Sequence, residues 1–173
     1  KIILATHADQ SLKLLDTPTP LEVSLLSEFN YTKNKAYLHS DIRLMPKKKL
    51  AWSSWNFLQN ELINHNFSLT YWMNRLQKID DPQNYFVSIN PHIEPSSLID
   101  RTFFEHPIFN MKTLDAQKKL GLIQGNQNTF FCGSYCGYGF HEDGIQSAAY
   151  VAKKLNIELP WKRSYDYKNR LTY

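Results

Sequence analysis

A glycine-rich stretch between an apolar run and a small-residue helix is the feature that most constrains this chain. Residues 129–132 are a short apolar run typical of a buried strand, and a helix is predicted from about 144 to 155. Four glycines lie between this run and the predicted helix or at the start of the helix, namely Gly133, Gly137, Gly139 and Gly144. Glycines let a backbone approach a ligand, and a helix N-terminus favours a phosphate or a polar ring edge. The pattern therefore indicates either a ligand-binding turn or an ordinary structural turn.

The start of the chain also has α/β character. Residues 2–5 read as a strand that is buried on both faces, and Asp9 is a suitable N-cap for the short helix that follows. Thr19 and Pro20 predict the start of a second helix, whose apolar stripe runs to Phe29. In the last third, Thr113 is expected to cap a helix that extends to about residue 120.

The middle of the chain, from about residue 30 to 104, has the pattern of strands instead. Aromatic and polar residues alternate there as they do in half-buried strands. The connections are too short for crossover helices, so we expect an antiparallel sheet, with a turn at 60–66. The expected strands are 36–39, 50–57, 67–73, 85–89 and 99–105. The fold class is therefore α+β with α/β segments at both ends.

Composition excludes several classes of protein. The net charge is +4, but the basic residues are scattered, so we expect no nucleic-acid partner. We find no apolar run of the length that crosses a membrane, and the two cysteines form no secreted disulfide framework, so we expect a cytoplasmic protein. Cys132, Cys136 and His141 make three possible ligands without a fourth, so we expect no metal.

Residues 131–144 read Phe-Cys-Gly-Ser-Tyr-Cys-Gly-Tyr-Gly-Phe-His-Glu-Asp-Gly. This string resembles the C-terminal flavin motif of a bacterial family of predicted NAD/FAD-binding proteins in the flavin-containing amine-oxidase superfamily. Similar domains are fused to cyclopropane-fatty-acid synthases in plants. Residues 3–10 resemble the strand and turn that re-enter the FAD domain, and 51–56 and 70–77 resemble the sheet of the substrate domain.

The resemblance implies a split FAD domain with Rossmann-like character. Residues 1–16 and 112–160 are expected to belong to it, 17–111 to form the substrate domain, and 161–173 to be a polar tail. The chain is then the C-terminal portion of an FAD-dependent oxidoreductase that moves a hydride from a substrate C–H bond to flavin. The βαβ unit with G-x-G-x-x-G is expected on an upstream segment or a separate chain, because Lys1 runs straight into an apolar strand. By itself the chain is expected to be inactive.

The resemblance also implies which residues contact the ligands. The expected cofactor contacts are Ala5, Thr6, Cys132, Gly133, Ser134, Glu142, Asp143, Gly144, Ile145 and Ser147. The expected substrate contacts, for a small or lipid-linked substrate, are Trp55, Tyr71 and Asn74. Ser134 departs from the acidic residue that many relatives have at this place, and Tyr135 and Cys136 replace Trp and Thr.

Several of these positions have a second interpretation. The start of the predicted helix is also explained by an ordinary N-cap at Asp143, and Trp52, Trp55, Tyr71 and Trp72 by core packing. Arg75 fits an anionic substrate or a surface ion pair. His141 beside Glu142 is an acid–base hypothesis, and we assign no catalytic residue.

Two alternatives concern the chain as a whole. One is a non-catalytic subunit that complements a separate N-terminal half, and it predicts exposed apolar faces at 2–4 and 130–132. The other is an inactive relic of a split flavoprotein.

Overall fold

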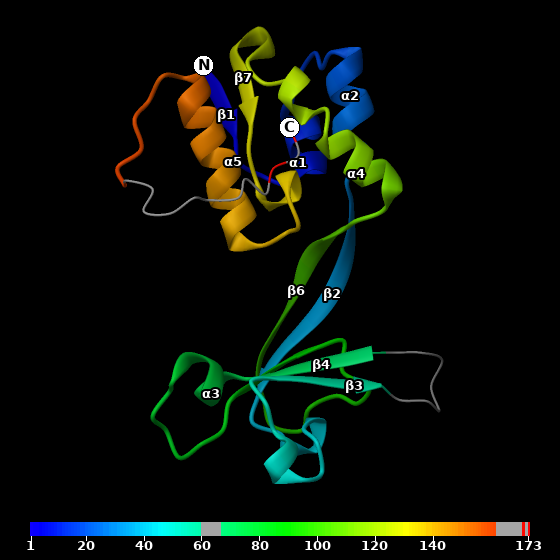
Figure 1. Ribbon diagram of the computed structural model, residues 1–173. Coiled ribbons are helices and arrows are strands. Elements are labelled where there is room, and N and C mark those ends of the chain that lie inside the picture. The colour runs from blue at the N-terminus through cyan, green and yellow to red at the C-terminus, as the bar shows by residue number, and fades with distance from the viewer. Residues whose placement is uncertain (60–66, 162–170, 172) are drawn as a thin grey trace. The chain divides into compact units, whose positions relative to one another are not determined.

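The computed structural model describes residues 1–59, 67–161, 171 and 173, and the expected turn at 60–66 lies outside them (Figure 1). The chain divides into two compact units. The first combines residues 1–32 with 106–173, and the second consists of residues 33–105. The boundaries expected from the sequence lie after residues 16 and 111, whereas the second predicted helix belongs to the first unit.

In the first unit, a short parallel strand pair lies among helices (Figure 1). Strand β1 (Ile2–Leu4) pairs with β7 (Thr129–Phe131), with Ile3 opposite Phe130. The helices are α1 (Ala8–Leu14), α2 (Pro20–Leu26), α4 (Met111–Gln117) and α5 (His141–Lys154).

The core of the first unit forms where these helices meet β7. Leu26, Leu120, Ile123 and Phe131 are fully buried in it. Leu171 is also buried in this cluster, and Tyr173 packs against it with its ring edge-on to Tyr150. The expectation of a polar tail over 161–173 is therefore wrong for Leu171 and Tyr173, whose apolar surfaces join the core.

The expected burial of β1 on both faces is wrong. Ile2 and Ile3 are 59% and 50% exposed. Within the described residues, β1 has a neighbouring strand only on its β7 side, so its outer side lacks the cover that a parallel strand usually has. The exposed apolar face predicted at 2–4 is confirmed for Ile2 and Ile3, whereas Leu4 packs against the core. The exposed face predicted at 130–132 is wrong, because all three side chains are buried.

The helix starts show where local sequence rules hold. At α2 the capping box is complete, because the Glu22 N–H donates to Thr19 Oγ1 at 3.2 Å and the Thr19 N–H to Glu22 Oε2 at 2.7 Å. Helix α1 begins after His7 instead of Asp9, and α4 begins after Asn110, whose side chain caps the Thr113 N–H. Helix α2 ends at Leu26, so Phe29 lies beyond it.

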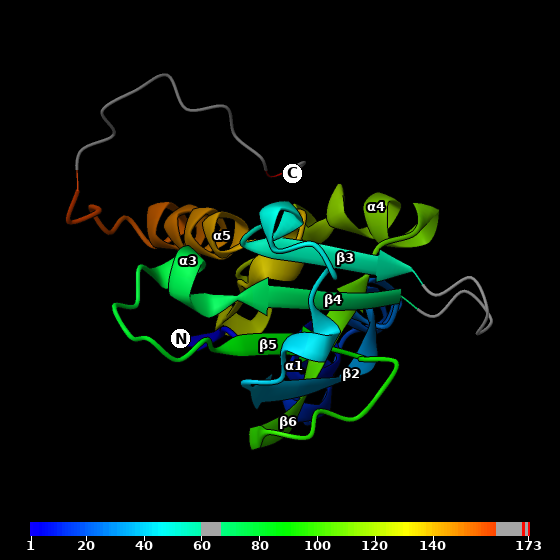
Figure 2. The ribbon, with the colours of Figure 1, turned by 90° about the horizontal axis from the view of Figure 1, so that it is seen from below.

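The second unit contains the predicted antiparallel sheet. Its strand order is β3-β4-β5-β2-β6, and Figure 2 shows β3, β4, β5 and β2 side by side. Pairing is antiparallel from β3 to β4, β4 to β5 and β5 to β2. The elements are β2 (Asn30–His39), β3 (Trp55–Gln59), β4 (Phe67–Trp72), the short helix α3 (Met73–Gln77), β5 (Phe86–Ile89) and β6 (Leu98–Ile108).

The strand expected from residue 50 begins only at Trp55. Residues Lys49–Ala51 form a 3₁₀ turn, and the indole N–H of Trp52 donates to the Pro46 carbonyl at 2.8 Å. The Asn56 amide holds Ser53 through two hydrogen bonds of 2.9 and 2.7 Å. These contacts fold the segment back on itself, so its apolar–polar alternation does not become a strand.

A row of polar side chains is buried on one face of this sheet. His39 Nε2 lies 2.8 Å from Ser88 Oγ, which lies 2.7 Å from Thr70 Oγ1. The Asp41 backbone N–H donates to His39 Nδ1 at 3.1 Å, which fixes the neutral ring with its proton on Nε2. Burial lowers the pKa of His39 below 6.5, and the Asp41 carboxylate opposes this only partly.

The free energy of unfolding is therefore expected to fall as the pH drops. The pKa of His39 is lower in the folded chain than in the unfolded chain, so the unfolded chain binds more protons below about pH 6.5. Urea denaturation of the wild type at about pH 7.5 and about pH 5 measures this loss. The His39→Gln variant keeps an N–H donor but does not titrate, so its loss should be smaller. Equal losses in both proteins would contradict the assignment to His39.

Candidate functional site

Two turns meet at the carboxyl ends of β1 and β7. The Cys132 N–H donates to the Leu4 carbonyl at 3.0 Å, which extends the strand pairing by one step. A side chain at Gly133 would place its Cβ 3.4 Å from the Thr6 carbonyl oxygen and 2.8 Å from the Tyr135 ring. The structure thus brings the predicted cofactor contacts in the 5–6 turn together with those at 132–134, and only glycine fits at 133.

Helix α4 holds the middle of the turn through Gln117. Its buried Nε2 donates to the carbonyls of Tyr135 and Gly137 at 2.8 and 2.6 Å. Sequence reasoning missed Gln117. The available signal was a polar residue next to Ala116 on the buried face of a helix, where an amide needs partners.

Asp143 closes the turn from the first turn of α5. Its carboxylate is fully buried and accepts the backbone N–H groups of Tyr138 and Phe140 at 3.0 and 2.8 Å. The prediction that Asp143 caps a helix starting at Gly144 is wrong, because α5 begins at His141 and Asp143 lies inside it. The carboxylate already supplies the negative charge that a helix N-terminus favours.

The remaining predicted contacts on α5 divide into buried and exposed groups. Ser147 Oγ accepts the Gly133 N–H at 2.9 Å and donates to the Gly144 carbonyl at 2.7 Å, so it ties α5 to the end of β7. Glu142 Oε1 accepts a hydrogen bond from Gln146 Nε2 at 3.2 Å, on the same helix. Ile145 is half exposed.

The exposed part of the turn is apolar and aromatic. Tyr138 and Phe140 are each 57% exposed, and the exposed His141 follows at the start of α5. The acid–base hypothesis for His141 and Glu142 stays a prediction. A flat polar ring could contact this surface through the aromatic side chains and the backbone.

The two cysteines are unsuited to nucleophilic chemistry. Both thiols are buried, and burial raises the pKa of Cys132 and raises that of Cys136 to about 12. A thiol reacts as its thiolate, so each is a small core residue in this fold. Across the described parts of the chain, no group of three or more His, Cys, Asp or Glu residues is placed to hold a metal ion.

We expect both thiols to resist a disulfide reagent such as dithiobisnitrobenzoate in the native protein. At mildly alkaline pH an exposed cysteine reacts within minutes, whereas Cys132 and Cys136 should react only after urea unfolds the chain. Counting the released thionitrobenzoate with and without urea measures this. Fast reaction of either thiol in the folded state would contradict the burial described above.

Gly137 is required by the buried carboxylate. A Cβ at this position would lie 2.5 Å from Asp143 Oδ1, whereas a Cβ at Gly144 would have its nearest atom 3.8 Å away. Gly137→Ala should therefore displace Asp143 and lower the free energy of unfolding by about 1–3 kcal/mol. Gly144→Ala is the matched control and should not be destabilised. Urea denaturation of both variants checks the difference, and equal stability would refute the role of Gly137.

The aromatic residues of the second unit separate onto two faces of the sheet. Trp52 packs edge-on against Trp72 and Phe86, with ring centroids 5.4 and 5.8 Å apart. Phe86 pairs with His39 in the register, so this is the face that carries the buried polar row. Trp55 and Tyr71 lie opposite each other in the register, 5.2 Å apart, and Trp55 is 58% exposed. Core packing therefore accounts for Trp52 and Trp72, whereas a substrate role for Trp55 and Tyr71 stays a prediction.

The other two polar candidates of this unit make contacts within the protein. Asn74 Nδ2 donates to the Gln83 carbonyl at 2.8 Å, and its Oδ1 accepts the Tyr85 N–H at 2.7 Å, so the amide holds a loop. Arg75 donates to the Trp52 carbonyl at 3.0 Å. A substrate role for Asn74 stays a prediction.

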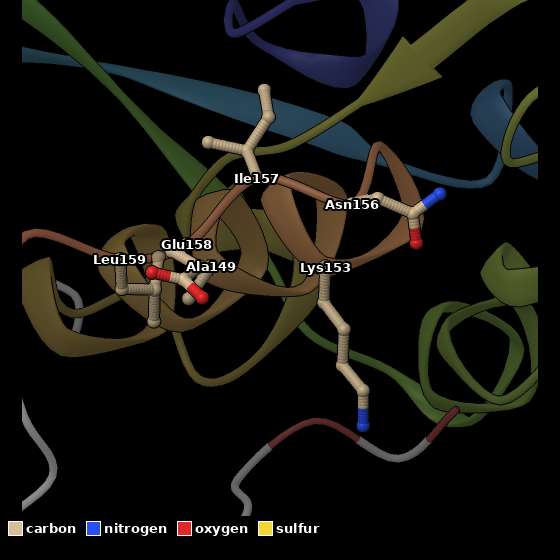
Figure 3. Close-up of a pocket in the computed structure, with 6 residues that line it drawn as sticks. All are labelled: Ala149, Lys153, Asn156, Ile157, Glu158 and Leu159. Carbon is tan, nitrogen blue, oxygen red and sulfur yellow. The ribbon is translucent and has the colours of Figure 1, made fainter.

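Two cavities among the described residues have no lining residue from the glycine-rich turn. One, of about 200 Å³, is lined by residues of β2, β5 and β6, including Leu38, Val87 and Phe104. The other, of about 500 Å³, lies at the far end of α5 and is lined by Ala149, Lys153, Asn156, Ile157, Glu158 and Leu159 (Figure 3). Figure 3 shows the side chains of Lys153, Asn156 and Ile157 pointing in different directions, so its polar groups do not converge.

None of the described helices is long and apolar enough to span a membrane. No family model matches the chain, and no curated protein matches it. The assignment to the amine-oxidase superfamily therefore stays a hypothesis that rests on the resemblances at 3–10, 51–56, 70–77 and 131–144.

Proposed function

We propose that this chain supplies the C-terminal part of an FAD-dependent oxidoreductase of the flavin-containing amine-oxidase type. The observation that carries the proposal is the contact between the turns at Thr6 and Gly133, beside the start of α5. In open α/β sheets, ligands bind outside the carboxyl ends of parallel strands. The glycine at 133 lets the Thr6 backbone and the Tyr135 ring pack closely there, which brings the two turns together at the strand ends.

The electrostatics of the turn favour the flavin ring over the pyrophosphate. Asp143 places a buried carboxylate at the N-terminus of α5, and Glu142 adds a second carboxylate in the same turn. A pyrophosphate would meet like charge here, whereas the uncharged polar edge of a flavin would not. The ADP half of FAD is then held by a dinucleotide-binding segment outside this sequence.

Bound FAD would supply the hydride chemistry, and the residues of this chain would orient the ring. We assign the exposed aromatic side chains of Tyr138 and Phe140 to cover the ring and exclude water from it. For the second unit, the open face with Trp55 and Tyr71 is the surface that we assign to an apolar substrate. A lipid-linked molecule fits that chemistry.

The exposure of β1 supports completion by a further segment. Ile2 and Ile3 present an apolar surface on a parallel strand whose outer side is uncovered among the described residues. A strand from a dinucleotide-binding segment would bury it. This same observation favours the second candidate function, a complementing subunit that becomes active only when it is paired.

Riboflavin, which carries the ring without phosphates, tests the assignment on the chain as it exists. We expect its fluorescence to be quenched weakly by the wild type, and ADP not to compete. Gly144→Ala should lower riboflavin affinity by about tenfold or more, because a methyl group enters the turn, while thermal stability is unchanged or raised by up to about 1 kcal/mol. Ala148→Ser, on the exposed side of α5, is the control and should leave binding unchanged.

Two outcomes would contradict the proposal. A folded wild type that leaves riboflavin fluorescence unchanged removes the flavin site. Competition by ADP would place a phosphate in the turn and overturn the electrostatic argument.

A further inference from the structure

Strand β6 is the exposed edge of the five-stranded sheet. It ends the strand order after β2, and residues 98–105 are all exposed. Ile99, Phe103 and Phe104 are 51%, 54% and 51% exposed, so the edge is apolar as well as open. An edge strand presents backbone N–H and C=O groups that can pair with another strand. Charged side chains on such an edge either prevent pairing with another chain or take part in it.

The charges on β6 are self-complementary. Residues 100–105 read Asp-Arg-Thr-Phe-Phe-Glu. When two copies of this strand pair antiparallel about Phe103, Arg101 of each copy lies opposite Glu105 of the other, and the two Phe103 side chains lie opposite each other. The two copies therefore form two Arg–Glu pairs around an aromatic centre.

Other registers of the same pairing are unfavourable. Residues that face each other across an antiparallel pair lie on the same face of the sheet, so a two-fold axis must pass through a residue position. An axis at Asp100 or Arg101 places like charges opposite each other. An axis at Thr102 places Arg101 opposite Phe103, and an axis at Phe104 places Glu105 opposite Phe103. Only the axis at Phe103 matches charge with charge.

We propose that this protein forms a two-fold dimer through β6, paired antiparallel about Phe103 into one continuous sheet. The proposal does not depend on the flavin assignment. Charge complementarity identifies a second copy as the partner, because each copy supplies both members of the Arg101–Glu105 pair. Lys33 lies over the Phe103 ring at 4.5 Å and adds positive charge on this face, which Glu105 of the second copy offsets.

Charge reversal and charge swapping test the register. Sedimentation velocity of the whole chain over a range of concentrations measures the dimer dissociation constant for wild type, Arg101→Glu, Glu105→Arg and the double variant. Each single reversal should weaken the dimer by about tenfold or more, because it places like charges opposite each other twice. The double variant should return to near the wild-type value. The side chain of Arg101 is 71% exposed, and its ion pair with the exposed Glu94 spans 3.9 Å, so reversing its charge should leave folding unaffected.

Lys112→Glu is the control for net charge, because it reverses an exposed charge on α4 and should leave the dimer unchanged. Circular dichroism confirms that every variant is folded. A wild type that stays monomeric at all concentrations overturns the proposal. So does a dimer that the single reversals leave intact, because it must use another surface. Single reversals that dissociate the dimer without rescue by the double variant overturn the register and the proposal with it.

Discussion

The parallel pairing of β1 with β7 determines how the rest of the first unit is arranged, because it joins the start of the chain to its last third. Ile2 pairs with Thr129 and Leu4 with Phe131, and the next step, from Cys132 to Leu4, brings the two following turns into contact. A whole second unit is inserted between the paired strands. The insertion is tolerated because the entropy of closing a loop rises only slowly with its length. The pairing also places the glycine-rich turn and the 5–6 turn at one edge, where a ligand can touch both.

The buried carboxylate of Asp143 is the second constraint on this turn, and it limits the ligand. A buried charge needs partners, and Asp143 takes the N–H groups of Tyr138 and Phe140. Those donors are therefore committed to the protein's own carboxylate and are lost to a bound phosphate. The buried carboxylate in turn requires a glycine at 137, since a side chain there would occupy the space of the carboxylate. The glycines of the motif thus differ in purpose, with Gly137 making room for Asp143 and Gly133 for the neighbouring backbone and ring.

Local signals predicted the elements that local interactions stabilise. The Thr19–Pro20–Glu22 pattern is satisfied within four residues, and the alternation in 67–73 and 85–89 became strands of an antiparallel sheet. The failures depend on distant contacts. Trp52 fits the alternation of a strand, but its indole N–H donates to the Pro46 carbonyl. Helix α5 begins earlier than predicted, because the Asp143 carboxylate accepts the Phe140 N–H. Gln117 could not be assigned a role, because its partners lie in a turn whose position depends on tertiary structure.

The polar row inside the second unit decides which face of the sheet can bind a ligand. His39, Ser88 and Thr70 satisfy one another in a buried chain of hydrogen bonds, and the Asp41 N–H fixes the ring of His39. A ligand on this face would have to break bonds that leave buried polar groups unpaired, which costs more than an exposed contact returns. The opposite face has no such commitment at Trp55 and Tyr71, which meet each other edge to face in partial contact with solvent. A sheet built in this way satisfies its buried polar groups on one face and leaves the other face available to the apolar substrate that we propose.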